Sequence, residues 1–158
     1  MLFSSMSFVF VFLPIVLLIY YICKSRNSKN TVLLASSILF YAWGEPKYLL
    51  IMLISIIITW GSAILISYCK NKKLFLILAV IVDLGILIYF KYTNFILENI
   101  FAVFGGHIDP IHIVMPIGIS FYTFQAISYL MDVYRGEVQE QRNIYKLMLF
   151  ITMFPQLV

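Results

Sequence analysis

Long apolar runs, separated by short clusters of bases or by turn residues, dominate the chain. Five runs are long or apolar enough to be candidate membrane spans, and a sixth begins at Leu147–Phe154. A helix needs about 20 apolar residues to cross the hydrocarbon core of a bilayer. The pattern therefore predicts about five transmembrane helices and the start of a sixth, with the complete spans at residues 6–23, 31–43, 48–69, 74–90 and 111–131.

Two regions do not fit the pattern of simple crossings. Thr31–Trp43 has only thirteen residues, so it either borrows Asn27–Asn30, tilts little or is partly covered by neighbours. The Gly44–Lys47 segment then predicts a turn, because Gly and Pro both interrupt helices. Residues 91–110 mix aromatic and charged residues and contain Gly105-Gly106, which favours an interfacial or re-entrant segment.

Composition assigns the chain to the integral membrane proteins. Hydrophobic residues make up 63% of its 158 residues and charged residues 11%, against about 45–50% and 25% in soluble domains. The predicted class is an all-α polytopic membrane protein. The bases lie at the ends of spans rather than in a tail or on one face, so the net charge of +4 does not indicate a nucleic-acid partner. Cys23 and Cys69 are too few for a disulfide framework.

The distribution of Lys and Arg predicts the orientation. If the spans alternate, the loops 24–30, 70–73 and 132–146 share one side of the membrane and hold nine bases, whereas the other side holds only Lys47 and Lys91. Cytoplasmic loops are enriched in Lys and Arg. We therefore expect these three loops in the cytoplasm of a multi-pass protein of the cell membrane, and the N-terminus outside.

Asp83 is an ionisable residue near the middle of a predicted span. Such a residue is costly in hydrocarbon and by default faces a bundle interior or a wet cavity. Either it is a protonated carboxyl that bonds a neighbouring helix, or it belongs to a polar conduit. Lys91 is not an obvious partner, because eight helical residues rise about 12 Å.

A second polar feature follows Pro116. Proline favours the first turn of a helix, so a helix is expected from about Pro116 to Gly136. On it, a polar stripe must face protein or water rather than lipid, either as glue between helices or as the lining of a substrate path. The stripe has the spacing i, i+4, i+7 and i+11 and consists of Phe121, Gln125, Ser128 and Asp132. Arg135 lies three residues after Asp132 and is placed to pair with it.

No motif for metal or nucleotide chemistry is found. His107 and His112 flank Asp109, but they lack the HExxH spacing and a third strong ligand, so no metal site is expected. A phosphate-binding loop, a dinucleotide fingerprint and a serine elbow are also absent from the sequence.

Several segments together resemble the membrane-bound O-acyltransferases, in the branch of the bacterial alginate O-acetylation proteins. The resemblance covers essentially the whole sequence in order. It is carried by Met1–Ser5, Phe40–Tyr48, Tyr89–Tyr92, Met115–Ala126, Asp132–Glu137 and Phe154–Val158.

The resemblance implies a ring of helices around a tunnel. An acyl group, most often acetyl, would pass from a cytoplasmic donor such as acetyl-coenzyme A or an acyl carrier to hydroxyls of an extracellular or exported polysaccharide. Partner proteins that relay the acyl group are also implied, and no bound cofactor is expected. The family's catalytic histidine lies beyond Val158, and neither His107 nor His112 matches its motif.

Because an apolar segment stops at Val158, we expect the sequence to be the N-terminal part of a longer chain. We expect this part to be inactive alone, because it lacks the catalytic histidine that the resemblance implies. By resemblance, Pro116, Gly118, Ser120, Phe121, Gln125, Asp132 and Arg135 match the signature block. We expect these residues, with Asp83 and Ser128, to shape a tunnel wall rather than make bonds. A fragment of a transporter, in which broken helices mark the site, and a non-catalytic membrane scaffold remain alternatives.

Overall fold

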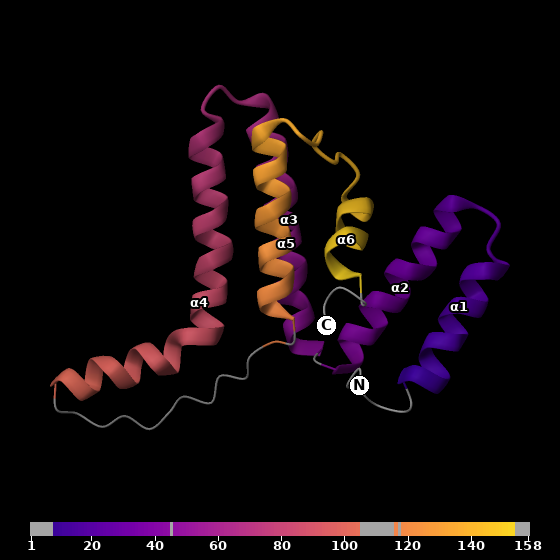
Figure 1. The fold of residues 1–158 in the computed structure, drawn as a ribbon, viewed down its shortest axis with the longest axis horizontal. Coiled ribbons are helices and arrows are strands. Elements are labelled where there is room, and N and C mark those ends of the chain that lie inside the picture. Colours follow the sequence, from indigo (N-terminus) through magenta and orange to yellow (C-terminus); the bar gives the residue numbers. More distant parts are fainter. Residues whose placement is uncertain (1–7, 45, 105–115, 117, 154–158) are drawn as a thin grey trace.

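The fold is a bundle of helices (Figure 1). The computed structural model describes residues 8–44, 46–104, 116 and 118–153, and no strand occurs among them. The expected all-α class is confirmed for this part of the chain. His107, Asp109 and His112 lie outside the described residues, as does most of the segment 105–117.

The first predicted span is helical over its described length but changes character along it. A π-helical turn, η1 (Phe8–Phe12), leads into α1 (Leu13–Ile22). Pro14 explains the wider turn, because its nitrogen carries no hydrogen and its ring clashes with the carbonyl of residue i−4. The side chains of Phe8, Val16 and Phe40 form a small core between this segment and the next helix.

The second and third helices are separated by a single residue. Helix α2 (Arg26–Gly44) begins five residues before the predicted run and so includes Asn27–Asn30. Hydroxyl side chains bond within the helix, for example Thr31 Oγ1 to the carbonyl of Asn27 at 2.9 Å. Helix α3 (Pro46–Tyr68) matches its predicted span within two residues, and Pro46 stands at its start, where a missing N–H costs nothing.

Helix α4 (Lys72–Phe104) is much longer than the predicted span of 74–90. Lys91 ends the apolar run, but no Gly or Pro occurs between Lys91 and Gly105, so the helix continues. Figure 1 shows that the C-terminal part of α4 bends sharply away from its first part. In that part Thr93 donates to the carbonyl of Tyr89, and Asn99 donates to that of Phe95 at 2.6 Å. Bonds of this kind commonly bend helices.

The last two helices are α5 (Ile119–Arg135) and α6 (Ile144–Thr152). The expected helix start near Pro116 is wrong. The Pro116 carbonyl instead accepts the N–H of Ile119 in a turn at 3.3 Å, and Gly118 before the helix has φ of +75°. This left-handed conformation disfavours side chains. The expected end at Gly136 is confirmed, with φ of +79° in a C-terminal cap.

Helix α3 lies at the centre and packs against α2, α4, α5 and α6. Its buried side chains recur at intervals of three and four residues, so they form one stripe. Met52, Ile56, Ala63 and Ile66 from this stripe are fully covered. The core is completed mainly by α5 and α6, whose fully covered members include Ile119, Tyr122, Leu130, Leu147 and Ile151.

Large apolar side chains also cover the outside of the bundle. Leu50 on α3 is 65% exposed and Ile81 on α4 is 60% exposed. Among the described residues, two helical segments are long and apolar enough to cross a membrane, Pro46–Tyr68 and Lys72–Ile100, and a shorter apolar helix covers Phe10–Ile22. An outer surface of this kind is stable where lipid rather than water surrounds it.

Three connections lie towards the same end of the molecule (Figure 1): α1 to α2, α3 to α4, and α5 to α6. These are the connections at the basic segments 24–30, 70–73 and 132–146. Away from this end, the ring of Tyr48 in the first turn of α3 lies 5.7 Å, between ring centroids, from that of Phe90 in the middle of α4. Basic residues are thus concentrated at one end of the bundle.

Candidate functional site

A cavity of about 720 Å³ lies between α5, α6 and the connection that joins them. Its α5 wall contains the whole polar stripe identified in the sequence, because residues spaced by three and four fall on one helix face. Phe121, Gln125, Ser128 and Asp132 therefore open onto one space, together with Tyr129. The remaining lining comes from the connection and α6, and consists of Val138, Gln139, Gln141, Lys146, Leu147 and Phe150.

Gln125 links the two helices that enclose the cavity. Its side-chain Nε2 donates to the backbone carbonyl of Phe150 at 2.7 Å. Phe150 lies in the last turn of α6, where backbone carbonyls lack partners within the helix. The amide of Gln125 satisfies one of them. This part of the stripe therefore provides the interhelical hydrogen bond that the sequence left open as one alternative.

The connection from α5 to α6 is bonded to α5 at one point. The hydroxyl of Tyr129 accepts the backbone N–H of Gln141 at 2.8 Å. Asn143 then caps α6, because its side-chain Oδ1 accepts the N–H of Tyr145 at 3.0 Å. The connection is therefore bonded to α5 near the middle of that helix and ends in a capped helix.

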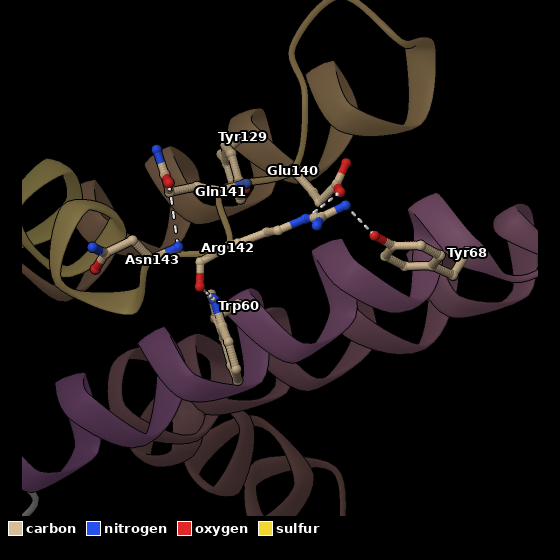
Figure 2. Close-up of polar contacts among 7 residues, drawn as sticks. All are labelled: Trp60, Tyr68, Tyr129, Glu140, Gln141, Arg142 and Asn143. Atoms are coloured by element: carbon tan, nitrogen blue, oxygen red, sulfur yellow. Dashed lines mark hydrogen bonds and ion pairs between the residues drawn. The ribbon is translucent and has the colours of Figure 1, made fainter.

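Arg142 bonds the same connection to α3 (Figure 2). Its backbone carbonyl accepts the indole N–H of Trp60 at 3.2 Å, and its guanidinium donates to the hydroxyl of Tyr68. The guanidinium carbon also lies 5.7 Å from the centre of the Tyr68 ring, in range of a cation–π interaction. We call the contacts of Trp60, Tyr68, Tyr129, Gln141 and Arg142 the strap.

Glu140 completes the charge balance of the strap. Its Oε1 lies 3.3 Å from Nε of Arg142, which forms an ion pair at the surface. The pKa of the Glu140 carboxyl lies below its usual range, chiefly because the backbone N–H of Glu140 donates to it, with a further contribution from Arg142. The Arg142 side chain is 75% exposed, and ion pairs at the surface contribute little to stability, so Glu140 serves mainly to neutralise the guanidinium.

The strap could not be found by motif or periodicity. Trp60 and Tyr68 belong to an apolar run, and only their polar atoms near the end of that run distinguish them. Their partners lie more than seventy residues away in the sequence. An aromatic side chain with a hydrogen-bonding atom at the end of a span is the one sequence signal available.

Asp83 is separate from the cavity. It is buried between α4 and α3, with 1% of its surface exposed, and its Oδ1 accepts the hydroxyl of Ser55 at 2.8 Å. Thr59 lies one turn further along α3 and donates to the carbonyl of Ser55 at 2.8 Å. Within the described residues, Oδ2 of Asp83 is buried without a hydrogen-bond partner. The structure thus places Asp83 in a helix-to-helix contact.

The other predicted site residues lie at the two ends of α5. Pro116, Gly118 and Ser120 stand at its beginning and do not line the cavity. The expected pairing of Arg135 with Asp132 is wrong. Arg135 lies 4.0 Å from Glu137 instead, because the chain turns at Gly136, and the carbonyl of Asp132 accepts the N–H of Glu137 at 3.0 Å.

The part of the chain that the structure describes contains no candidate metal site. No group of three or more His, Cys, Asp or Glu residues converges there. The cavity instead combines aromatic and aliphatic walls with amide, hydroxyl and carboxyl groups and the ammonium of Lys146. Such a lining suits a small polar group on an apolar arm.

Comparison with known proteins shows that this chain is similar to part of several bacterial O-acetylases. A probable alginate O-acetylase of Pseudomonas syringae pv. tomato is 39% identical, and one of Pseudomonas aeruginosa is 40% identical; each alignment covers 100% of this chain and 32% of the relative. A peptidoglycan O-acetyltransferase of Helicobacter pylori is 36% identical over 85% of this chain and 27% of its own length. No family model and no solved structure matches.

The chain is similar along its whole length to these alginate O-acetylases, in agreement with the resemblance that the sequence motifs indicate. It spans about a third of the length of the curated relatives that it matches.

Proposed function

We propose that the protein containing this sequence is an O-acyltransferase that moves an acetyl group from a cytoplasmic donor to hydroxyls of a polysaccharide outside the cytoplasm. The relatives are described as probable alginate O-acetylases and as a peptidoglycan O-acetyltransferase, and these descriptions support acetyl transfer. The donor that fits is a thioester such as acetyl-coenzyme A or an acyl carrier. Relay proteins that handle the acyl group outside the membrane are part of the proposal.

The structural observation that carries the proposal is the cavity on α5. The residues that match the family signature and the residues that line the cavity overlap at Phe121, Gln125 and Asp132. A polar thioester and a sugar cannot cross hydrocarbon unaided, so the transferase needs a protein-walled passage. We assign the residues that line the cavity to the wall of that passage, near its cytoplasmic end.

In this arrangement the chain positions the acyl group and does not make or break bonds. Acyl transfer needs a base that deprotonates the acceptor hydroxyl and donors that stabilise the charge on the thioester carbonyl. Among the described residues, the cavity contains no histidine. We assign the general base to the histidine that the family resemblance implies beyond Val158.

The proposed topology has five crossings, formed by η1 with α1, by α2, by α3, by the first part of α4 and by α5. The C-terminal part of α4 would lie along the outer membrane surface. The three connections at the basic end would face the cytoplasm, as nine of the eleven Lys and Arg residues in the sequence lie there.

Deletion of the gene tests the function. We expect the O-acetyl content of the exported polysaccharide to fall to background, and to recover when the wild-type gene is supplied. Unchanged O-acetylation in the deletion strain, with no second homologous gene, would refute the proposal.

Cysteine labelling tests the topology. In a full-length protein with Cys23 and Cys69 replaced by Ser, a single Cys at Lys47 should react with an impermeant maleimide in intact cells. A single Cys at Lys73 or Arg142 should react only after permeabilisation. The opposite pattern would invert the orientation.

A further inference from the structure

A hollow with three lysines lies where α3 turns into α4. Lys70, Lys72 and Lys73 line it, with Asn71 between them and Tyr134 from the end of α5 beside them. The hollow has a volume of about 720 Å³. Three ammonium groups within four residues repel each other, and this arrangement is more stable with an anion present.

No carboxylate in the described part of the chain neutralises this cluster. The ion pairs seen there join Arg135 to Glu137 and Arg142 to Glu140, and neither includes a lysine of the hollow. The basic connection between α1 and α2 differs, because the ammonium of Lys29 lies 5.0 Å from the centre of the Tyr20 ring. The hollow at α3–α4 is therefore positively charged and open to an anionic ligand.

Part of the lining of the hollow is aliphatic. Leu74 and Ile77 line it together with the lysines, and they are 53% and 44% exposed. Both belong to α4, one of the two long apolar helices. A ligand that fills the hollow must therefore offer phosphate-like oxygens at one end and hydrocarbon at the other, which a free phosphate does not.

We propose that this hollow binds the headgroup of an anionic phospholipid, with the phosphate among Lys70, Lys72 and Lys73 and the start of an acyl chain on Leu74 and Ile77. The inference rests on the proposed membrane placement, in which the α3–α4 turn lies at the cytoplasmic surface. Basic clusters at that level attract anionic lipid, by about fivefold in affinity per Lys or Arg. The α3–α4 hairpin would thereby be held at a fixed depth in the bilayer.

The test measures lipid binding by the purified full-length protein in detergent, using native mass spectrometry. Phosphatidylglycerol and phosphatidylcholine are titrated separately. We expect phosphatidylglycerol to bind at least tenfold more tightly. In the triple variant K70Q/K72Q/K73Q, its affinity should fall by about 100-fold, since each lysine contributes roughly fivefold.

Two matched variants separate site chemistry from folding and from total charge. K70R/K72R/K73R keeps the charge and should bind within a few-fold of the wild type. K24Q/R26Q/K29Q removes three charges from the basic connection between α1 and α2 and should also bind like the wild type. An equal loss in this second variant would show that only net charge matters, and would overturn the assignment.

Soluble phosphates distinguish the source of the ligand. Millimolar inorganic phosphate or acetyl-coenzyme A should not displace phosphatidylglycerol, and displacement by either would reassign the hollow to a soluble ligand. Equal binding of the two lipids would also refute the inference. O-acetylation of the exported polysaccharide by the deletion strain supplied with the wild-type gene is measured in parallel: O-acetylation without lipid preference refutes this inference alone, and lipid preference without O-acetylation refutes the proposed function alone.

Discussion

The indole N–H of Trp60 donates to the backbone carbonyl of Arg142 at 3.2 Å, across 82 residues of sequence. This contact joins the central helix α3 to the connection that forms the rim of the cavity (Figure 2). Because Gln141 next to it is also bonded to Tyr129 of α5, the rim is held between two helices. The strap thus couples the packing of the bundle to the shape of the candidate passage.

Removal of the indole donor should loosen this rim. Trp60→Phe keeps an aromatic ring but loses the hydrogen bond, so we expect about 1 kcal/mol less stability. Thermal unfolding of the full-length protein in detergent measures it. Acetyl transfer should show a raised KM for the donor with kcat nearly unchanged, since the rim positions the donor. Trp43→Phe, at an exposed ring elsewhere, is the control, and an equal effect there would contradict the role.

The side-chain amide of Gln125 should stabilise the contact between α5 and α6 as a hydrogen-bond donor. In Gln125→Glu the shape is kept, but a carboxyl replaces the amide that donates to the carbonyl of Phe150. We expect a loss of about 1 kcal/mol or more, because the carbonyl loses its partner and an anion faces it. Gln125→Met, which is neutral and similar in length, should be less harmful. If the glutamate variant unfolds at the wild-type temperature, the bond does not hold α5 to α6.

Asp83 should tolerate loss of its charge. The bond from Ser55 needs only an acceptor oxygen, which Asn supplies, so Asp83→Asn should keep stability and acetyl transfer near wild type. Asp83→Leu should lose about 1 kcal/mol, since the buried Ser55 hydroxyl loses its interhelical acceptor. Loss of activity in a stable Asp83→Asn protein would show that the charge itself is needed, as in a polar conduit.

The two glycines Gly136 and Gly85 form a matched pair. Neither has an atom within 4 Å of an added Cβ, but Gly136 has φ of +79°. Gly136→Ala should therefore cost about 1–2 kcal/mol from backbone conformation alone. Gly85→Ala should be neutral or slightly stabilising, because Ala favours helix more than Gly by about 1 kcal/mol. Unfolding temperatures compare them, and equal shifts would contradict the argument.

The sequence predicts the helices better than it predicts their ends. Hydropathy indicates where a helix would enter and leave lipid, so both ends of the predicted span 48–69 lie within two residues of the ends of α3. Backbone helix does not stop where charge appears, which is why α4 continues past Lys91 and α2 begins at Arg26. At α5 the positive φ of Gly118 delays the start beyond Pro116, and a proline alone does not reveal this.

The site was predictable only on one helix. The spacing of Gln125, Ser128 and Asp132 is a property of α5 itself, so periodicity identified that wall of the cavity. The opposite wall and the strap arise from tertiary packing of α3 and α6 against a polar connection. No local pattern encodes such contacts, and Arg135 illustrates the same limit, since its partner depends on the turn at Gly136.

The central claim is that the cavity between α5 and α6 belongs to the acyl passage, and a cavity-filling substitution tests it most directly. In a strain lacking the chromosomal gene, full-length Ser128→Phe is compared with Phe124→Trp, which enlarges an exposed side chain of α5 outside the cavity lining. At equal protein levels in the membrane, we expect the O-acetyl content of the exported polysaccharide to fall at least tenfold with Ser128→Phe and to stay near wild type with Phe124→Trp. Full O-acetylation with Ser128→Phe would contradict the account.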